Sequence, residues 1–303
     1  MRTGIPVILS SSFEGSLRNM RERYADAMSI FTKYSAPDLF ITFTANPKWP
    51  EITENLRPSE HTTGRPDLLA RVFNLKLKSL MDDPTVHGAL GKSIAQMYTI
   101  EFQRRGLSHA HILIVLWAAD KFSTSEHIDK FVRAEIPSWI ENLRLHGIVT
   151  KCLMHGPCGI DNPGAPCMEA GQCKTMFPKE FRTETTMNNP YLLLKYDAHI
   201  NVEVCTSLRA VKYIYKYIYK GFDCANMVLS AGQVQYNEIE NYIDARYVSA
   251  PEAMWRLLGS HMHDRSHAVM RLSVHLPNQK RVTFKDGHEG EALEAARSRQ
   301  KML

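Results

Sequence analysis

The sequence predicts an α+β domain, in which a central antiparallel sheet is flanked by helices and carries a cysteine-rich, zinc-binding insertion. Three observations lead to this fold class. Short runs of β-branched and aromatic residues alternate with longer segments of helical periodicity. Two of the strand-like runs are joined by a short turn that contains glycine, as in a hairpin. Residues 152–181 hold four of the six cysteines and have little periodicity.

The composition is that of a soluble globular protein. The 303 residues are 44% hydrophobic and 23% charged, and the net charge of +5 permits nucleic acid as a partner without requiring it. No apolar run approaches the ~18–20 residues of a membrane span, so no membrane partner is expected. No signal peptide is visible, and we therefore expect a reducing compartment in which the cysteines are free thiols or metal ligands.

In the first 150 residues the sequence predicts three helical and three extended segments. The helices are expected over Arg21–Thr32 (ended by Pro37), Pro66–Met81 and Ser125–Leu145, the last interrupted near Pro137. The strands are expected over Leu39–Thr44, Ile94–Phe102 and His109–Trp117, and the last two are joined by a turn at Arg104–Leu107.

The second half is predicted to contain the insertion, one further strand and three further helices. The strand is Ile200–Val204, and the helices are Ser207–Tyr219 (ended by Gly221), Asn237–Tyr247 and Pro251–Leu258. Residues 287–303 form a charged tail.

Two histidines, His109 and His111, lie two residues apart on the second hairpin strand. Alternation places both imidazoles on one face, which suits one divalent ion; two histidines on a solvated face would give the same pattern. If the hairpin turns about Gly106, Gln103 lies opposite His109. Glu101 then lies opposite His111. Two imidazoles with an amide or carboxylate oxygen make a half-open Mg²⁺ or Mn²⁺ site, with Gln103 favoured over Glu101 as third ligand.

Residues 212–221 read KYIYKYIYKG, with tyrosines at alternate positions. A strand fits this pattern, but a helix fits at least as well and puts Tyr213 and Tyr217 on one face. Tyrosine can act as a covalent nucleophile, although its usual pKa near ~10 means that a metal or ammonium groups must assist it. An amphipathic helix packed on a sheet would give the same spacing. The basic residues beside the two tyrosines are Lys212, Lys216 and Lys220.

The insertion and several basic or aromatic residues complete the candidate sites. His155, Cys158, Cys167 and Cys173 have spacings that suit a tetrahedral zinc, with Cys152 as a possible substitute ligand. Reduced cysteines without metal are the alternative. The candidate DNA contacts, which combine cations for phosphates with an aromatic for stacking, are Lys48, Trp49, Arg104, Arg105, Lys212, Lys216 and Lys220. A core position is equally compatible with Trp49.

Together these features resemble the Rep domain of Helitron rolling-circle transposons, also called the Helitron helicase-like domain. DLFITFTANPKWPEI (38–52) resembles its first motif and IEFQRRGLSHAHILI (100–114) its histidine-hydrophobic-histidine motif. HGPCG and APCMEAGQCKTMFPKEFRTETT, within 155–186, resemble its cysteine-rich insertion. NPYLLLKYDAHINVEVCTSLRAVKYIYKYIYKGFD (189–223) resembles its third motif, and IDARYVSAPEAMWRLLG and VHLPNQKRVTF also fit.

The resemblance implies a nuclease of the HUH class. Its metal, held by His109, His111 and a third polar ligand, would position a scissile phosphate of single-stranded DNA at transposon ends and targets. Tyr213 and Tyr217 match the catalytic tyrosines, whose attack gives a 5′-phosphotyrosine and a 3′-hydroxyl. Tyr215 and Tyr219 do not match. Strand transfer then needs no nucleotide cofactor, and a nuclear location is implied.

The resemblance also implies a domain division. Residues 1–150 would be the first part of the nuclease domain, 151–186 the zinc insertion, 187–286 the rest of the nuclease with the tyrosine helix, and 287–303 a tail before an absent helicase. The family's longer segment between Thr186 and Asn189 is almost absent. Two other functions stay open: a catalytically silent single-strand DNA-binding module from a decayed transposon, and a metal-dependent nuclease that uses water.

Overall fold

The computed structural model describes residues 9–83, 90–102, 107–122, 124, 128–129, 131–132, 136–153, 158–160, 162–174, 190–205, 248–271, 282 and 284–298. The chain divides into two compact units, Met1–His267 and Ala268–Leu303. Within the second unit, part of the charged tail predicted over residues 287–303 forms the helix α10 (Glu289–Ser298). No helix among these residues is both long and apolar enough to cross a bilayer.

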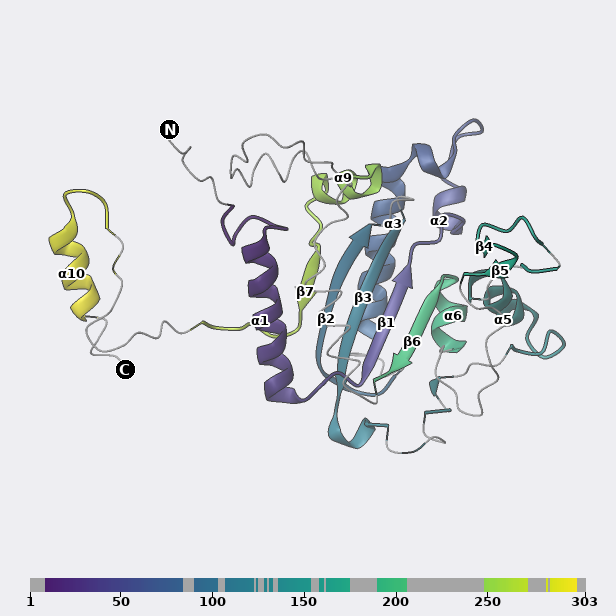
Figure 1. Ribbon diagram of the computed structural model, residues 1–303, viewed down its shortest axis with the longest axis horizontal. Helices are drawn as coiled ribbons and strands as arrows, with labels where there is room; N and C mark the ends of the chain where they lie inside the picture. Colours follow the sequence, from purple (N-terminus) through teal and green to yellow (C-terminus); the bar gives the residue numbers. More distant parts are fainter. Residues whose placement is uncertain are drawn as a thin grey trace. The chain divides into compact units, whose positions relative to one another are not determined.

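The first unit is built on a five-stranded sheet with the order β6-β1-β3-β2-β7, in which every neighbouring pair is antiparallel (Figure 1). Its strands are β1 (Leu39–Thr44), β2 (Ser93–Phe102), β3 (Ser108–Leu116), β6 (Ile200–Val204) and β7 (His263–Arg265). The bounds predicted for β1 and β6 are those observed, and the β2–β3 hairpin is confirmed. The α+β fold class predicted from the sequence is therefore confirmed.

Helices lie on both sides of the sheet. They are α1 (Leu17–Tyr34), α2 (Pro50–Thr53), α3 (Pro66–Asp82), α5 (Leu143–Ile148), α6 (Pro190–Tyr196) and α9 (Ala250–Leu257). Short helical turns occupy η1 (Thr62–Gly64), η3 (Ala118–Asp120) and η4 (Val149–Leu153). The predicted helices at 21–32, 66–81 and 251–258 are confirmed within the longer or slightly shifted α1, α3 and α9.

The main core lies between the sheet and α3. Phe43 of β1 stacks on Phe73 of α3 with ring centroids 5.2 Å apart, and Phe73 in turn contacts Trp255 of α9 at 5.8 Å. These rings, together with Ile100 and Ile112 on the same face of the sheet, are almost fully buried. Removing this much apolar surface from water is the main stabilising contribution to the fold and fixes which face of each strand is turned inward.

One predicted helix is wrong over part of its length. Residues 136–142 are not helical, and α5 begins only at Leu143. The start is fixed locally, because the Asn142 side chain accepts a hydrogen bond from the backbone N–H of Leu145 at 2.9 Å. Pro137 has no N–H to offer a preceding helical turn. The predicted helices Ser207–Tyr219 and Asn237–Tyr247 lie outside the described residues.

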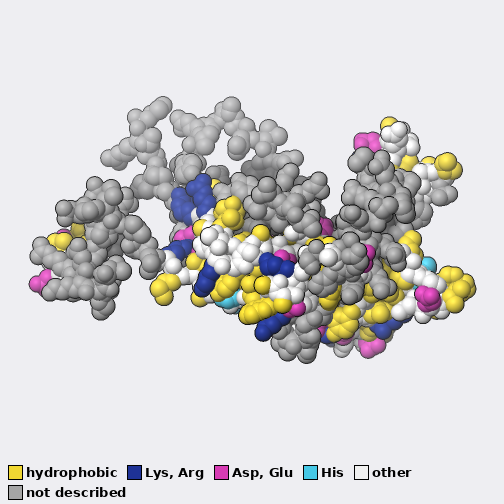
Figure 2. Space-filling view, turned by 90° about the horizontal axis from the view of Figure 1, so that it is seen from below, with side chains coloured by type: hydrophobic (Ala, Val, Ile, Leu, Met, Phe, Trp, Pro, Cys, Tyr) yellow, Lys and Arg dark blue, Asp and Glu magenta, His cyan; other side chains and the backbone are white. Residues whose placement is uncertain are grey.

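The described surface mixes charge types. In Figure 2, Lys and Arg side chains alternate with hydrophobic side chains and with isolated Asp or Glu side chains on the visible face. Lys121, for example, pairs with Asp38 at 3.1 Å, and the Lys92 ammonium lies 5.0 Å from the centre of the Trp117 ring. Charge alone therefore does not mark a nucleic-acid path on this part of the surface.

Candidate functional site

The two histidines of β3 lie on the face of the sheet that is turned away from the α3 core. Ala110 and Ile112, their neighbours in the strand, are buried in that core. His109 and His111 therefore point to the opposite face, as strand alternation predicts. Both are nevertheless shielded from solvent: His109 is 8% exposed and the side chain of His111 is 10% exposed. Because so little solvent reaches these side chains, electrostatic interactions between them are stronger than they would be in water.

His109 is oriented by the neighbouring strand. Thr44 of β1 lies directly opposite it, and the Thr44 hydroxyl is 2.8 Å from His109 Nδ1. Burial, followed by the neighbouring His111, lowers the pKa of His109 to about 4, so the ring is neutral at pH 7. Its Nε2 is buried and has no hydrogen-bond partner among the described residues. When Nδ1–H donates to Thr44, this Nε2 carries the lone pair that a metal ion requires.

His111 is held by a carboxylate and by an aromatic ring. Its Nε2 lies 3.1 Å from Glu101 Oε2, and its ring stacks on Phe40 with centroids 5.8 Å apart and planes inclined by 6°. Phe40 and Glu101 come from the strands on either side of β3. The imidazole is thus fixed from both sides, on rigid elements of the sheet, which is how precise ligand placement is obtained.

The register of the hairpin corrects one expectation. Glu101, not Gln103, lies opposite His109, and Thr99 lies opposite His111. The shift is by two residues, so every side chain keeps the face that alternation assigns to it. Glu101 still reaches His111, as a diagonal neighbour across the pair. Gln103, the favoured third ligand, lies outside the described residues, as do Arg104 and Arg105.

A further histidine, which sequence reasoning missed, adjoins this group. His199 immediately precedes β6, and its Nδ1 lies 3.4 Å from the Thr44 hydroxyl that also contacts His109. Burial lowers the pKa of His199 as well. Thr44 and His199 come together only because β1 lies between β3 and β6. The one sequence signal was their position, at the end of one predicted strand and directly before another.

His109, His111 and Glu101 have the donor types that a divalent cation needs, but not yet the spacing. An unused buried imidazole nitrogen on His109 and the facing nitrogen and oxygen of His111 and Glu101 are donors that Mn²⁺ and Mg²⁺ sites use. Among the described residues, however, the ligand atoms of these three do not all lie within 4.8 Å of one another, whereas those of Cys158, Cys167 and Cys173 do. The group therefore needs a small rearrangement or a further ligand.

The cysteine cluster is held by a two-residue hairpin. β4 (Met168–Glu169) pairs with β5 (Gln172–Cys173), and the turn residues Ala170 and Gly171 both have positive φ, 50° and 78°. This turn brings Cys173 back towards Cys167, and Cys158 completes the group. Three thiols at this spacing can hold a structural metal such as zinc. His155 lies outside the described residues, and Cys152 is not part of the cluster.

Burial and the neighbouring thiols of Cys173 and Cys167 raise the pKa of the Cys158 thiol to about 11. A thiol in this group is therefore protonated at neutral pH in the absence of a cation. Metal ligation requires thiolates, so binding of a metal here would release protons.

The structure places the predicted DNA-contacting residues in different environments. Lys48 is exposed, as a phosphate contact must be. Trp49 is 1% exposed, and its indole N–H donates to the backbone oxygen of Tyr196 at 2.7 Å. Burial therefore favours the core position for Trp49, which the sequence left as open as base stacking, and the ring also contacts Phe43 of β1. Tyr213, Tyr217, Lys212, Lys216 and Lys220 lie outside the described residues.

A comparison with known protein families matches the part of the chain that contains these histidines. Residues 2–114 match the family model described as the Helitron helicase-like domain at the N-terminus, which confirms the resemblance predicted from the sequence. The matched segment includes β1, β2 and both histidines, while the cysteine cluster lies beyond it. No curated protein matches the chain. Residues 2–114 are therefore similar to a Helitron domain, and this similarity supports a transposon-associated function.

Proposed function

We propose that this protein cuts and rejoins single-stranded DNA by a metal-dependent tyrosine mechanism, as a step of rolling-circle transposition. The observation that carries the proposal is the buried, neutral His109 beside the His111–Glu101 pair, inside the segment that matches the Helitron model. A buried imidazole with an unused nitrogen is a costly feature for a core, and cation binding gives it a use.

His109, His111 and Glu101 would hold Mg²⁺ or Mn²⁺, with Gln103 as the other candidate ligand. Once bound, the ion would supply Lewis-acid polarisation of a phosphate oxygen and fix its orientation. When the Thr44 hydroxyl accepts from Nδ1–H, it holds His109 in the tautomer that leaves Nε2 available. Phe40 fixes the plane of His111 by stacking. The protein's own contribution at this position is therefore a largely buried set of oriented donors, which a small rearrangement or a further ligand would complete.

The nucleophiles in this proposal are Tyr213 and Tyr217. The phenol of one loses its proton to solvent and attacks phosphorus, which forms a Tyr O–P bond and breaks the bond from phosphorus to the 3′-oxygen. The leaving 3′-oxygen takes up a proton and becomes a hydroxyl, while the 5′-phosphate stays on tyrosine. Attack by another 3′-hydroxyl reverses these changes. The number of phosphoester bonds is conserved, so joining needs no nucleotide cofactor.

The cysteine cluster has a separate, structural role in the proposal. Cys158, Cys167 and Cys173 bind one zinc with His155 as fourth ligand, and the closed set of four leaves no position for substrate. Residues 151–186 have few buried apolar side chains among those described, so metal binding supplies folding free energy that packing does not.

The test is incubation of labelled single-stranded DNA with the protein and Mn²⁺, followed by denaturing electrophoresis. We expect a protein–DNA adduct that disappears in the double variant Tyr213→Phe/Tyr217→Phe and on chelation of the metal. Tyr215→Phe, in the same segment, is the matched control and keeps the adduct. Cleavage without any adduct would indicate attack by water, and binding without cleavage would indicate a silent DNA-binding module. Either result refutes the tyrosine mechanism.

A further inference from the structure

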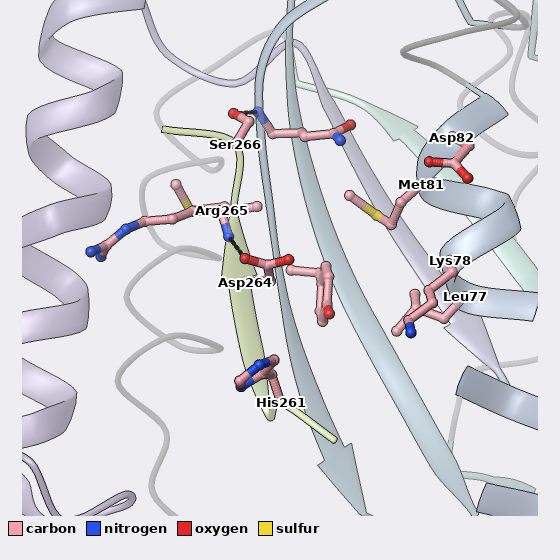
Figure 3. Close-up of a pocket in the computed structure, with 11 residues that line it drawn as sticks. Leu77, Lys78, Met81, Asp82, His261, Asp264, Arg265 and Ser266 are labelled. Atoms are coloured by element: carbon pink, nitrogen blue, oxygen red, sulfur yellow. Dashed lines mark hydrogen bonds between the residues drawn. The ribbon is translucent and has the colours of Figure 1, made fainter. Parts of the chain in front are cut away.

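A cleft of about 350 Å³ lies between α3 and the β2–β7 edge of the sheet, and no role in the proposed chemistry accounts for it (Figure 3). Its apolar part is formed by Leu77 and Met81 of α3 and by Tyr98 of β2. In Figure 3, the side chains of Leu77, Lys78 and Met81 extend from α3 towards β7, and the Asp264 carboxylate lies on the facing side. The volume is within the range of small-ligand pockets.

The cleft lies on the opposite face of the sheet from the histidines. Tyr98 shares its face with Ile100, which is buried in the α3 core. Glu101 and His109 point the other way. Asp264, which lies directly opposite Tyr98 in the β2–β7 pair, is on the α3 side as well. A ligand in this cleft is therefore separated from the reacting phosphate by the sheet, and its contacts serve recognition.

Gln96 provides the strongest indication of a ligand. Its backbone is fully paired with Ser266, since Gln96 N–H donates to the Ser266 hydroxyl and Ser266 N–H donates to the Gln96 carbonyl, both at 2.9 Å. Gln96 lines the cleft, and its side-chain Oε1 is buried and has no hydrogen-bond partner among the described residues. A buried amide oxygen without a donor is unfavourable, so a ligand that brings an N–H group would be stabilised here.

The other groups restrict what that ligand can be. The Asp264 carboxylate accepts a hydrogen bond from the Arg265 backbone N–H at 2.8 Å through one oxygen, and it adds a second acceptor group to the lining of the cleft. The Tyr98 ring and the Met81 thioether give flat and adaptable apolar contacts, which suit an aromatic ring. Lys78 supplies one exposed cation at the rim. The acceptors inside the cleft match the amino group of a nucleobase, and the Tyr98 ring matches its flat surface. The Lys78 cation at the rim matches an attached phosphate.

We propose that this cleft binds an amino-bearing nucleobase, namely adenine, cytosine or guanine, either within single-stranded DNA or as a free nucleotide. Binding of a base within single-stranded DNA rests on the proposed function, whereas binding of a free nucleotide does not. In both cases Gln96 Oε1 accepts from the base, Tyr98 contacts its ring and Lys78 attracts its phosphate. Uracil and thymine present a carbonyl oxygen where cytosine presents its amino group, so the hydrogen bond from that position to Gln96 Oε1 is lost.

The experiment compares oligo-dC with oligo-dU of equal length, because the two bases have the same size and differ in the amino group. The full chain should bind oligo-dC about tenfold more tightly, as one lost polar contact to a base implies. Gln96→Met keeps the length of the side chain and removes its polar atoms, and should bring the ratio to about one. Gln172→Met, on the distant β5 hairpin, is the matched control and keeps the preference.

A titration with dCMP separates the two sources. Gln96-dependent binding of dCMP without any oligo-dC preference assigns the cleft to free nucleotides, and the preference for oligo-dC assigns it to DNA. Tyr98→Leu removes the aromatic ring and should weaken binding of both oligo-dC and dCMP. This second variant tests the cleft independently if Gln96→Met does not fold. If neither ligand responds to Gln96→Met in a folded protein, the inference is wrong, even where a tyrosine adduct forms. If no tyrosine adduct forms but Gln96→Met still weakens binding of oligo-dC or dCMP, the proposed function is wrong and the inference about the cleft is supported.

Discussion

The histidine group and the cysteine cluster are both candidate cation sites, yet they are held in opposite ways. His109 and His111 sit on a central strand whose alternate residues are buried in the main core, and Thr44, Phe40 and Glu101 fix them from two further strands. Cys167 and Cys173 are held by a hairpin with two residues in each strand. The first group draws its rigidity from the fold, and the second has to draw it from the metal.

This difference predicts that substitutions in the histidine group lower DNA cleavage, whereas substitutions in the cysteine cluster disturb local folding. The largest expected effect on cleavage is that of His109→Ala, because it removes a proposed ligand outright. Cleavage should fall by more than about 100-fold, since even residues behind metal ligands typically contribute 10–100-fold. The change is measured as the rate of DNA cleavage in Mn²⁺. A circular dichroism spectrum like that of the parent protein is the control for folding, and near-parental cleavage would exclude His109 as a ligand.

Thr44→Val should have the next largest effect. Valine keeps the shape of threonine but loses the hydroxyl that contacts His109 Nδ1. Loss of tautomer control should lower metal affinity or cleavage by about 10–100-fold, and higher Mn²⁺ concentrations should restore part of it. Thr42→Val is the matched control on the same face of β1, opposite His111. Equal effects of the two substitutions would mean that the Thr44 contact has no special role.

Cys158→Ser should affect cleavage less and local structure more. The purified protein should contain one zinc per chain, and the variant should contain none. Proteolysis within residues 151–186 should become faster, while the five-stranded sheet keeps its thermal transition, because the cluster contributes nothing to the main core. Cys152→Ser is the matched control, since Cys152 lies outside the cluster. Absence of zinc from the parent protein, by elemental analysis, would contradict the structural metal.

Trp49→Phe should have the smallest effect on DNA and a clear effect on stability. The variant loses the indole N–H that donates to the Tyr196 carbonyl, which then stays buried without this donor. The free energy of unfolding should fall by about 1–3 kcal/mol in urea titrations. The affinity for single-stranded DNA, measured on the folded variant, should not change. A specific loss of DNA affinity would reinstate Trp49 as a contact.

Four strands of the sheet and its histidine face could be predicted because they depend on local periodicity, whereas the three-residue strand β7 was not predicted. β1 and β6 were predicted with their observed bounds, since β1 is made up mostly of β-branched and aromatic residues and β6 alternates Ile or Val with polar residues. The hairpin register was wrong by two residues for a physical reason. Alternation has a period of two, so any even shift preserves the buried face. The pairing of Phe102 with Ser108 decides the register, and local pattern carries no information on it.

Contacts between distant segments could not be predicted. Thr44 meets His109 across 65 residues and His199 across 155, because β1 lies between β3 and β6 in the sheet. Trp49 next to Lys48 has the composition of a base-stacking site, but the carbonyls of Tyr196 and Asp197, far along the chain, accept its indole N–H in the interior. Tertiary packing, not local sequence, decides such positions.

The central claim is that DNA becomes attached to tyrosine at the metal-binding face. The most direct measurement is peptide mapping by mass spectrometry after the full-length protein has reacted with single-stranded DNA and Mn²⁺ and the DNA has been trimmed by nuclease. We predict a nucleotide mass on Tyr213 or Tyr217, and none when His109 is replaced by Ala. Efficient cleavage with no modified tyrosine, or modification of Tyr215 instead, would contradict the account.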